Sequence, residues 1–253
     1  MTLQILSERR LDGDLLERSL LVGDVPGILW MPPLDPSGSA PLILLGHPGG
    51  LDAQHPRLIA RARRSAQDGF ASAALELPGS GSRPRLSALE EARAELRTAL
   101  GAREPVADAT VDRLVLPLVD AAVPECRAAL DALSALPGLG GPVGYSGGII
   151  SLGVRLALAD PRIAAAVLFA GSWIPRVILE EARAMRIPIH MLLQWDDVDN
   201  PRQAALDLFD AFGSPEKSLA ANLGGHTGVP AYAGDEAARF LARHLGVASS
   251  RAA

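Results

Sequence analysis

Short, wholly apolar runs alternate along this sequence with longer stretches whose apolar residues recur at helical spacing. Residues 41–46 (PLILLG) form one such run and end in a glycine-rich corner, which is typical of a strand buried on both faces of a parallel sheet. The next stretch carries its apolar residues on one helix face, at Leu58, Ile59, Ala62 and Ala66. Because parallel strands need helical crossovers, the alternation predicts an α/β fold with helices on both faces of the sheet.

The alternation continues to the end of the chain and predicts a mostly parallel eight-stranded sheet. Two short strands within residues 18–31, joined by a turn at Gly23 and Asp24, are expected to form an antiparallel edge. The other strands are predicted at residues 41–46, 71–77, 142–145, 163–170, 187–195 and 218–223. A helix is predicted at residues 56–69, with Pro56 in the first helical position. A longer helix is predicted to end near residue 136 and to start or kink at Pro117 or Pro124. The other helices are predicted at residues 86–100, 149–158, 175–185, 201–212 and 235–245.

Length and composition limit the class of protein. The 253 residues suit a single domain spanning residues 1–253, with short cap segments at 83–111 and 173–185. A formal net charge of −5 argues against a nucleic-acid binder. The single cysteine, Cys126, excludes a disulfide framework within one chain. The N-terminal residues lack the apolar core of a signal peptide and no apolar run is long enough to span a membrane, so a cytoplasmic protein is expected.

The sharpest motif is the G-x-S-x-G pattern formed by Gly144, Tyr145, Ser146, Gly147 and Gly148. It lies between a predicted strand and a predicted helix, which is the context of a nucleophile elbow. In such an elbow the serine occupies a strained, sharp turn that exposes its hydroxyl above the sheet, next to the N–H groups of the following helix. The pattern taken alone fits a plain glycine turn equally well, because the chain contains 25 glycines.

A second glycine-rich corner, residues 47–50 (HPGG), follows the strand at residues 41–46. A backbone N–H at such a corner can stabilise an oxyanion. Pro48 has no N–H, so the donor is Gly49 or Gly50, and Gly49 is preferred. Gly147, directly after the serine, is the expected second donor.

An acid and a histidine complete the pattern, each on a loop after a predicted strand. Asp196, Asp197 and Asp199 follow the strand at residues 187–195, before Asn200 as helix N-cap and Pro201 as first helical residue. His226 lies in a glycine-flanked loop after residues 218–223. One of the carboxylates could orient His226, which as general base would take the proton of Ser146. Each loop also has a simpler reading, as a solvated acidic turn or a polar loop without a role.

Ser146, an acid and then His226 occur in the chain order of the α/β-hydrolase superfamily, which this sequence resembles from about residue 21 to residue 245. Residues 76–81 (ELPGSG) resemble a strand-plus-loop pattern of that family, with Glu76 where Asp is usual. The size and the lack of a large cap resemble the branch of dienelactone-hydrolase-like proteins and small bacterial esterases. Ser146 stands where dienelactone hydrolases carry cysteine.

The resemblance implies an α/β-hydrolase fold and carboxylic-ester hydrolysis through a Ser-His-Asp triad and a covalent acyl-enzyme. By its offset to Pro201, Asp197 is preferred over Asp196 and Asp199 as the acid. We expect a small-molecule ester in a mainly aliphatic pocket, no cofactor, no metal, no nucleic-acid or membrane partner, and we leave a homodimer open. A peptidase, a thioesterase or a lactone or C–C hydrolase would use the same triad, and a ligand-binding or scaffold protein with a dead site would share the fold.

Overall fold

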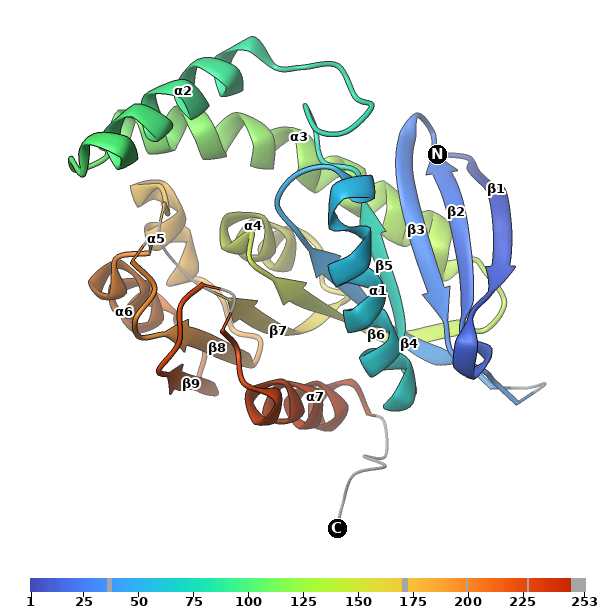
Figure 1. Ribbon diagram of the computed structural model, residues 1–253. Helices are drawn as coiled ribbons and strands as arrows, with labels where there is room; N and C mark the ends of the chain where they lie inside the picture. Colours follow the sequence, from blue (N-terminus) through green and yellow to red (C-terminus); the bar gives the residue numbers. More distant parts are fainter. Residues whose placement is uncertain (36–37, 170–172, 199, 227, 247–253) are drawn as a thin grey trace.

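One twisted sheet runs through the computed structural model, which describes residues 1–35, 38–169, 173–198, 200–226 and 228–246 (Figure 1). In these residues the sheet has nine strands in the order β1-β2-β3-β5-β4-β6-β7-β8-β9. The strands are β1 (Leu3–Arg10), β2 (Leu16–Val22), β3 (Val25–Met31), β4 (Ala40–Gly46), β5 (Ala71–Leu75), β6 (Leu139–Gly147), β7 (Ile163–Phe169), β8 (Ile189–Gln194) and β9 (Lys217–Asn222). The helices are α1 (Leu51–Gln67), α2 (Ser87–Ala102), α3 (Asp108–Ser134), α4 (Ile150–Ala159), α5 (Arg176–Ala182), α6 (Arg202–Ala211) and α7 (Ala231–Leu245).

The sheet divides into an antiparallel edge and a parallel centre. β1, β2 and β3 pair antiparallel, and β3 pairs antiparallel with β5. The pairings from β5 through β4, β6, β7 and β8 to β9 are all parallel. The carboxyl ends of these six strands therefore meet at one edge, which is where ligands bind in open α/β sheets. The α/β prediction is confirmed.

Helices cover both faces of the sheet, as the alternation of the sequence predicts. α1 and α7 bury Leu58, Ala62, Leu241 and Leu245 against β4 and β7 on one face. α3, α4, α5 and α6 bury their apolar residues on the opposite face, among them Leu130 and Leu156. α2 packs on α3, farther from the sheet (Figure 1).

The sequence predicts eight strands, and the described residues contain one more, the edge strand β1. Every residue of β1 except Leu3 is exposed, so this edge strand shows no alternation of buried and exposed positions. Its backbone pairing with β2 holds it in the sheet, with a register irregularity between Ile5 and Ser7.

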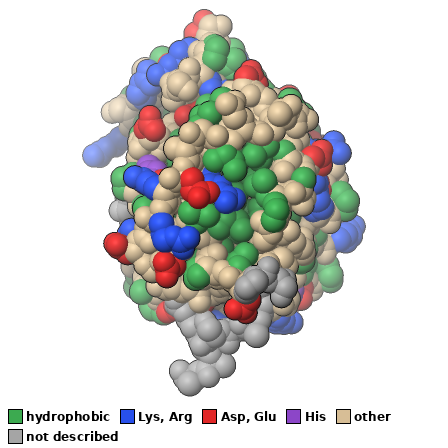
Figure 2. Space-filling model, turned by 90° about the vertical axis from the view of Figure 1, so that its right-hand side faces the viewer, with side chains coloured by type: hydrophobic (Ala, Val, Ile, Leu, Met, Phe, Trp, Pro, Cys, Tyr) green, Lys and Arg blue, Asp and Glu red, His purple; other side chains and the backbone are tan. Residues whose placement is uncertain are grey.

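Figure 2, which faces this end of the molecule, shows hydrophobic side chains gathered at the centre with charged side chains around them.

Pro56 does not occupy the first helical position, and no helix starts at Pro117 or Pro124, because proline is tolerated inside these helices. α1 begins at Leu51, so Pro56 lies within it. Pro56 leaves the carbonyl of Asp52 without an intrahelical donor, and both residues are exposed, so water can bind that carbonyl. α3 begins at Asp108 and runs through Pro117 and Pro124. No helix in the described part of the chain is long and apolar enough to cross a membrane.

Leu130 provides a test of the core between α3 and the sheet. Leu130→Ala should lower the free energy of unfolding by about 2–5 kcal/mol, because the side chain is 0% exposed and its removal leaves a cavity. Leu100→Ala is the matched control, since Leu100 in α2 is 41% exposed and should change stability by about 0.5 kcal/mol or less. Urea unfolding measures both. Equal losses in the two variants would contradict this description of the core.

Candidate active site

The residues singled out in the sequence lie on loops at the carboxyl edge of the parallel strands. The HPGG corner follows β4, and Ser146 is the penultimate residue of β6. Asp197 follows β8, and His226 follows β9. The topology therefore brings four segments from distant parts of the chain to one edge of the sheet.

Asp197 and His226 are hydrogen-bonded partners. The Nδ1 atom of His226 lies 2.7 Å from Oδ2 of Asp197. The Asp197 side chain is 2% exposed and that of His226 is 47% exposed, so the pair has a buried acid and an accessible imidazole. An ionised carboxylate only accepts hydrogen bonds, so Nδ1 carries the proton and Nε2 is left free to accept one. This arrangement suits a general base oriented by an acid.

Asn200 also belongs to this cluster, in a role that the sequence did not indicate. Its Nδ2 donates to Oδ2 of Asp197 over 2.6 Å and lies 3.0 Å from Nδ1 of His226. The prediction that Asn200 caps the next helix is wrong, because Pro201 is the N-cap of α6. Asp196 is exposed, and Asp199 lies outside the described residues.

Ser146 occupies an ordinary strand position. It pairs with Leu45 in the register of β4 and β6, and it is not among the residues with positive φ. The strand continues to Gly147, and α4 begins only at Ile150. The expectation of a strained serine at a sharp turn is therefore wrong, because the glycines that follow make the turn instead.

Gly147 is required at its position by close packing between strands. It pairs with Gly46, and a Cβ atom on Gly147 would overlap the carbonyl group of Gly46. The hydroxyl of Tyr145 donates to the carbonyl of Ile149 over 2.8 Å and bridges the turn before α4. The missing side chain of Gly147 allows the end of β6 to approach the end of β4, and the Tyr145 hydrogen bond fixes the turn that follows.

The hydroxyl of Ser146 contacts Arg61 of α1. Nη2 of Arg61 lies 3.1 Å from Oγ of Ser146 and 2.5 Å from the Ser146 carbonyl oxygen. Among the described residues, no hydrogen bond joins Ser146 to His226. The structure thus brings Asp197 and His226 together and leaves Ser146 bonded to an arginine that sequence reasoning did not single out. Its only sequence signal is a cation on the apolar face of a predicted helix, next to Ala62.

Buried polar side chains stabilise the HPGG corner through hydrogen bonds to the backbone. Nε2 of His47 lies 2.9 Å from the Leu75 carbonyl oxygen, so this nitrogen carries the proton, and burial lowers the pKa of His47. Glu76 accepts the backbone N–H of Leu51 at the start of α1 over 3.0 Å, and burial raises the pKa of this carboxyl. Gly49 has a φ of +92°, which favours glycine. The N–H groups of Gly49 and Gly147 stay the predicted oxyanion donors.

A cavity of about 650 Å³ opens beside this corner. Five of its ten lining residues have polar or charged side chains, while the larger part of its exposed lining surface is apolar. The lining residues are Pro48, Gly49, Gly50, Asp52, Ala53, Gln54, Ser80, Gly81, Arg85 and Arg93. Several of them belong to the corner itself, so we take this cavity as the candidate substrate pocket.

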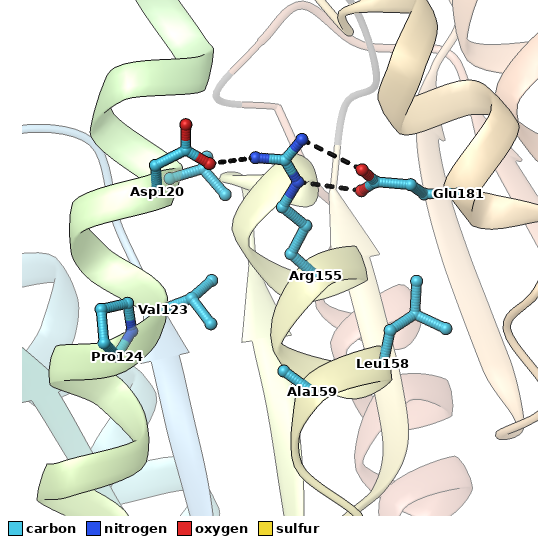
Figure 3. Close-up of a pocket in the computed structure, with 8 residues that line it drawn as sticks. Asp120, Val123, Pro124, Arg155, Leu158, Ala159 and Glu181 are labelled. Atoms are coloured by element: carbon cyan, nitrogen blue, oxygen red, sulfur yellow. Dashed lines mark hydrogen bonds and ion pairs between the residues drawn. The ribbon is translucent and has the colours of Figure 1, made fainter.

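A second cavity, of about 510 Å³, lies between α3, α4 and α5 (Figure 3). There Arg155 donates to both carboxylate oxygens of Glu181, over 2.9 and 3.0 Å, and also binds Asp120. Its charged groups pair with one another, and none of the predicted site residues lines it. In the described part of the chain, no cluster of three or more His, Cys, Asp or Glu side chains could hold a metal ion.

Solved structures with the same fold include esterases. The PEG-bound complex of a cold-adapted esterase from an Arctic intertidal metagenomic library is 26% identical, with a TM-score of 0.72, over 97% of this chain and 100% of that chain. An acetyl xylan esterase from Paenibacillus sp. R4 is 14% identical, with a TM-score of 0.64, over 96% of this chain and 88% of that chain. TT1662 from Thermus thermophilus is 18% identical, with a TM-score of 0.62, over 98% and 100% of the two chains. No protein-family model and no curated protein sequence matches this chain.

His47 makes a testable contribution to the pH dependence of stability. Its folded pKa is lowered by burial, so the unfolded chain binds more protons once the pH falls below the unfolded value of about 6.5. Stability should therefore fall between pH 7.5 and 5.5, and His47→Gln, which can still donate to the Leu75 carbonyl, should reduce that fall. Urea unfolding at the two pH values measures it. An unchanged fall in the variant would show that His47 is not buried in its neutral form.

Proposed function

We propose that this chain, an esterase-like enzyme of the α/β-hydrolase superfamily, hydrolyses carboxylic esters with Ser146 as nucleophile, His226 as general base and Asp197 as the orienting acid. The observation that carries the proposal is the pair of Asp197 and His226, with Nδ1 and Oδ2 2.7 Å apart, on two loops at the carboxyl edge of the sheet. The likeness to the cold-adapted esterase, over nearly the whole of both chains, supports ester hydrolysis as the reaction class.

Acylation begins when Oγ of Ser146 attacks the ester carbonyl carbon. The serine proton passes to Nε2 of His226, and the C–O bond to the alcohol breaks as His226 returns that proton to the leaving oxygen. Water then attacks the acyl-enzyme with His226 again as base, which releases the acid and restores Ser146. Asp197 stabilises the imidazolium through Nδ1 in both halves of the reaction.

The negative charge of each tetrahedral intermediate needs donors that are already in place. The N–H groups of Gly49 and Gly147 are the proposed pair, because each lies at a glycine corner at the end of neighbouring strands β4 and β6. Pro48 precedes Gly49 and cannot donate, because its ring nitrogen carries no hydrogen.

Ser146 must come within reach of His226 during the reaction. In the structure its side chain accepts a hydrogen bond from Arg61. The exposed imidazole of His226 packs edge-to-face on the ring of Phe169, with 5.5 Å between the ring centroids. Catalytic hydrogen bonds are often long in unliganded enzymes and tighten when substrate binds. We therefore propose that Ser146 and His226 come into contact when substrate binds.

The proposed substrate is a small ester with a polar part. The cavity beside the HPGG corner presents Ser80, Arg85 and Arg93 together with Asp52 and Gln54. These polar groups can hydrogen-bond a polar acyl or alcohol group, while the larger part of the exposed lining is apolar and can pack against the rest of the ester. Peptides, thioesters and lactones would use the same catalytic residues, and a comparison of these substrates separates the classes.

Ser146→Ala should abolish hydrolysis of p-nitrophenyl acetate and labelling by a fluorophosphonate probe, because the covalent step needs Oγ. Ser151→Ala, five residues further along in α4, is the control and should retain both, since Ser151 is buried. Intact-mass measurement after labelling reports the covalent adduct directly. Undiminished activity or labelling of Ser146→Ala would refute the proposed nucleophile, and wild-type protein that shows neither would indicate a ligand-binding protein with this fold.

The acid is tested by replacing each candidate in turn. Asp197→Asn should lower kcat by about 10⁴-fold, because the amide favours the wrong histidine tautomer. Asp196→Asn should stay within about threefold of wild type, or about 0.65 kcal/mol, because the Asp196 side chain is exposed. Asp199→Asn should do the same, because the proposal gives Asp199 no role. Steady-state kinetics on the same ester compares all three. A larger loss at either of the other two positions would move the assignment there.

A further inference from the structure

We infer that Arg61 is a positioning residue of the active site, which holds Ser146 and polarises its hydroxyl oxygen. The inference rests on the proposed function, because it concerns the nucleophile assigned there. Four observations carry it: the place of Arg61 on α1, its three acceptors, its lack of an acidic partner, and the link it makes between two strand ends.

Arg61 lies on the side of α1 that faces the sheet. Its neighbours Leu58 and Ala62 are each 1% exposed and belong to the core between α1 and the sheet. An arginine at such a position extends its charged group along the apolar layer toward polar atoms. Here the guanidinium reaches the carboxyl ends of β4 and β6 below the HPGG corner.

The guanidinium donates to three oxygen atoms of two residues. Nη1 donates to the Gly46 carbonyl over 3.0 Å, and Nη2 donates to the Ser146 carbonyl over 2.5 Å and to Ser146 Oγ over 3.1 Å. Gly46 and Ser146 are diagonal neighbours, because Leu45 pairs with Ser146 and Gly46 with Gly147. One side chain therefore ties together the two strand ends that lead to the proposed oxyanion donors.

Arg61 has no acidic partner in the part of the chain that the structure describes. Among the described residues, none of the ion pairs within 4.0 Å includes Arg61, whereas Arg64 on the same helix pairs with Asp235. Burial lowers the pKa of Arg61 to about 10, so the group stays charged at neutral pH. The charge also acts on its surroundings, since burial and then Arg61 both contribute to the lowered pKa of His47.

The direction of the hydrogen bond to Ser146 has a chemical consequence. A guanidinium has donors only, so Oγ of Ser146 must accept in this contact. Its own proton is then free to point elsewhere, toward the base that removes it. A fixed cation next to Oγ also stabilises the negative charge that develops there as the proton leaves.

Arg61→Met should lower kcat by on the order of 10²-fold, the usual loss for one preorganised donor, with KM within about threefold because Arg61 does not line the candidate pocket. Its fluorophosphonate labelling should slow in parallel with kcat, because both reactions begin with attack by Oγ of Ser146. Arg61→Lys retains the charge and should therefore lose less kcat than Arg61→Met. Arg63→Met, an exposed position of α1, is the control that should match wild type in every measurement.

Arg61→Gln serves if the Met variant does not fold, because its amide can still donate to a strand-end carbonyl. It should show a lowered kcat with KM within about threefold of wild type. Wild-type kcat in a folded Met or Gln variant would overturn the inference while Ser146→Ala remains inactive. Full activity of Ser146→Ala would instead overturn the proposed function, so the two failures are distinguishable.

Discussion

The close approach of β4 and β6 at their carboxyl ends is the constraint on which the rest of the site depends. Gly46 and Gly147 face each other across this pairing, and a Cβ atom on Gly147 would overlap the carbonyl group of Gly46. Because neither residue carries a side chain, the two strands stay paired to their last residues. The loops that leave them, the HPGG corner and the turn into α4, consequently begin side by side.

Polar side chains packed behind these strand ends stabilise the carboxyl edge of the sheet. His47 binds the Leu75 carbonyl, Glu76 binds the backbone of Leu51, and Arg61 binds the carbonyls of Gly46 and Ser146. Each contact joins two segments distant in sequence and gives a hydrogen-bond partner to a backbone group, which is a carbonyl at a strand end or, for Leu51, the N–H at the start of α1. A buried polar group costs free energy unless it is hydrogen-bonded, so these contacts favour one arrangement of the loops. Asp197, Asn200 and His226 form a second polar cluster on the neighbouring loops.

Much of the fold was predictable, and the exceptions have identifiable causes. The parallel strands bury both faces and read as apolar runs, which is why β4, β5, β7 and β8 were expected near their observed bounds. β1 was not expected, because an edge strand held by backbone pairing needs no apolar pattern. α1 and α3 extend past their prolines, since a solvent-exposed helix face tolerates the lost hydrogen bond.

The sequence by itself determined the α/β class, the loops that carry the candidate residues, and the order of serine, acid and histidine along the chain. Those properties follow from local patterns of apolar residues and glycines, which involve only residues close together in the sequence. Only the tertiary structure decided that Asp197 rather than Asp196 lies against His226, that Asn200 joins them, and that Ser146 faces Arg61 from an ordinary strand position. These contacts join side chains that are separated by up to 85 residues, and their geometry depends on strand register and helix packing.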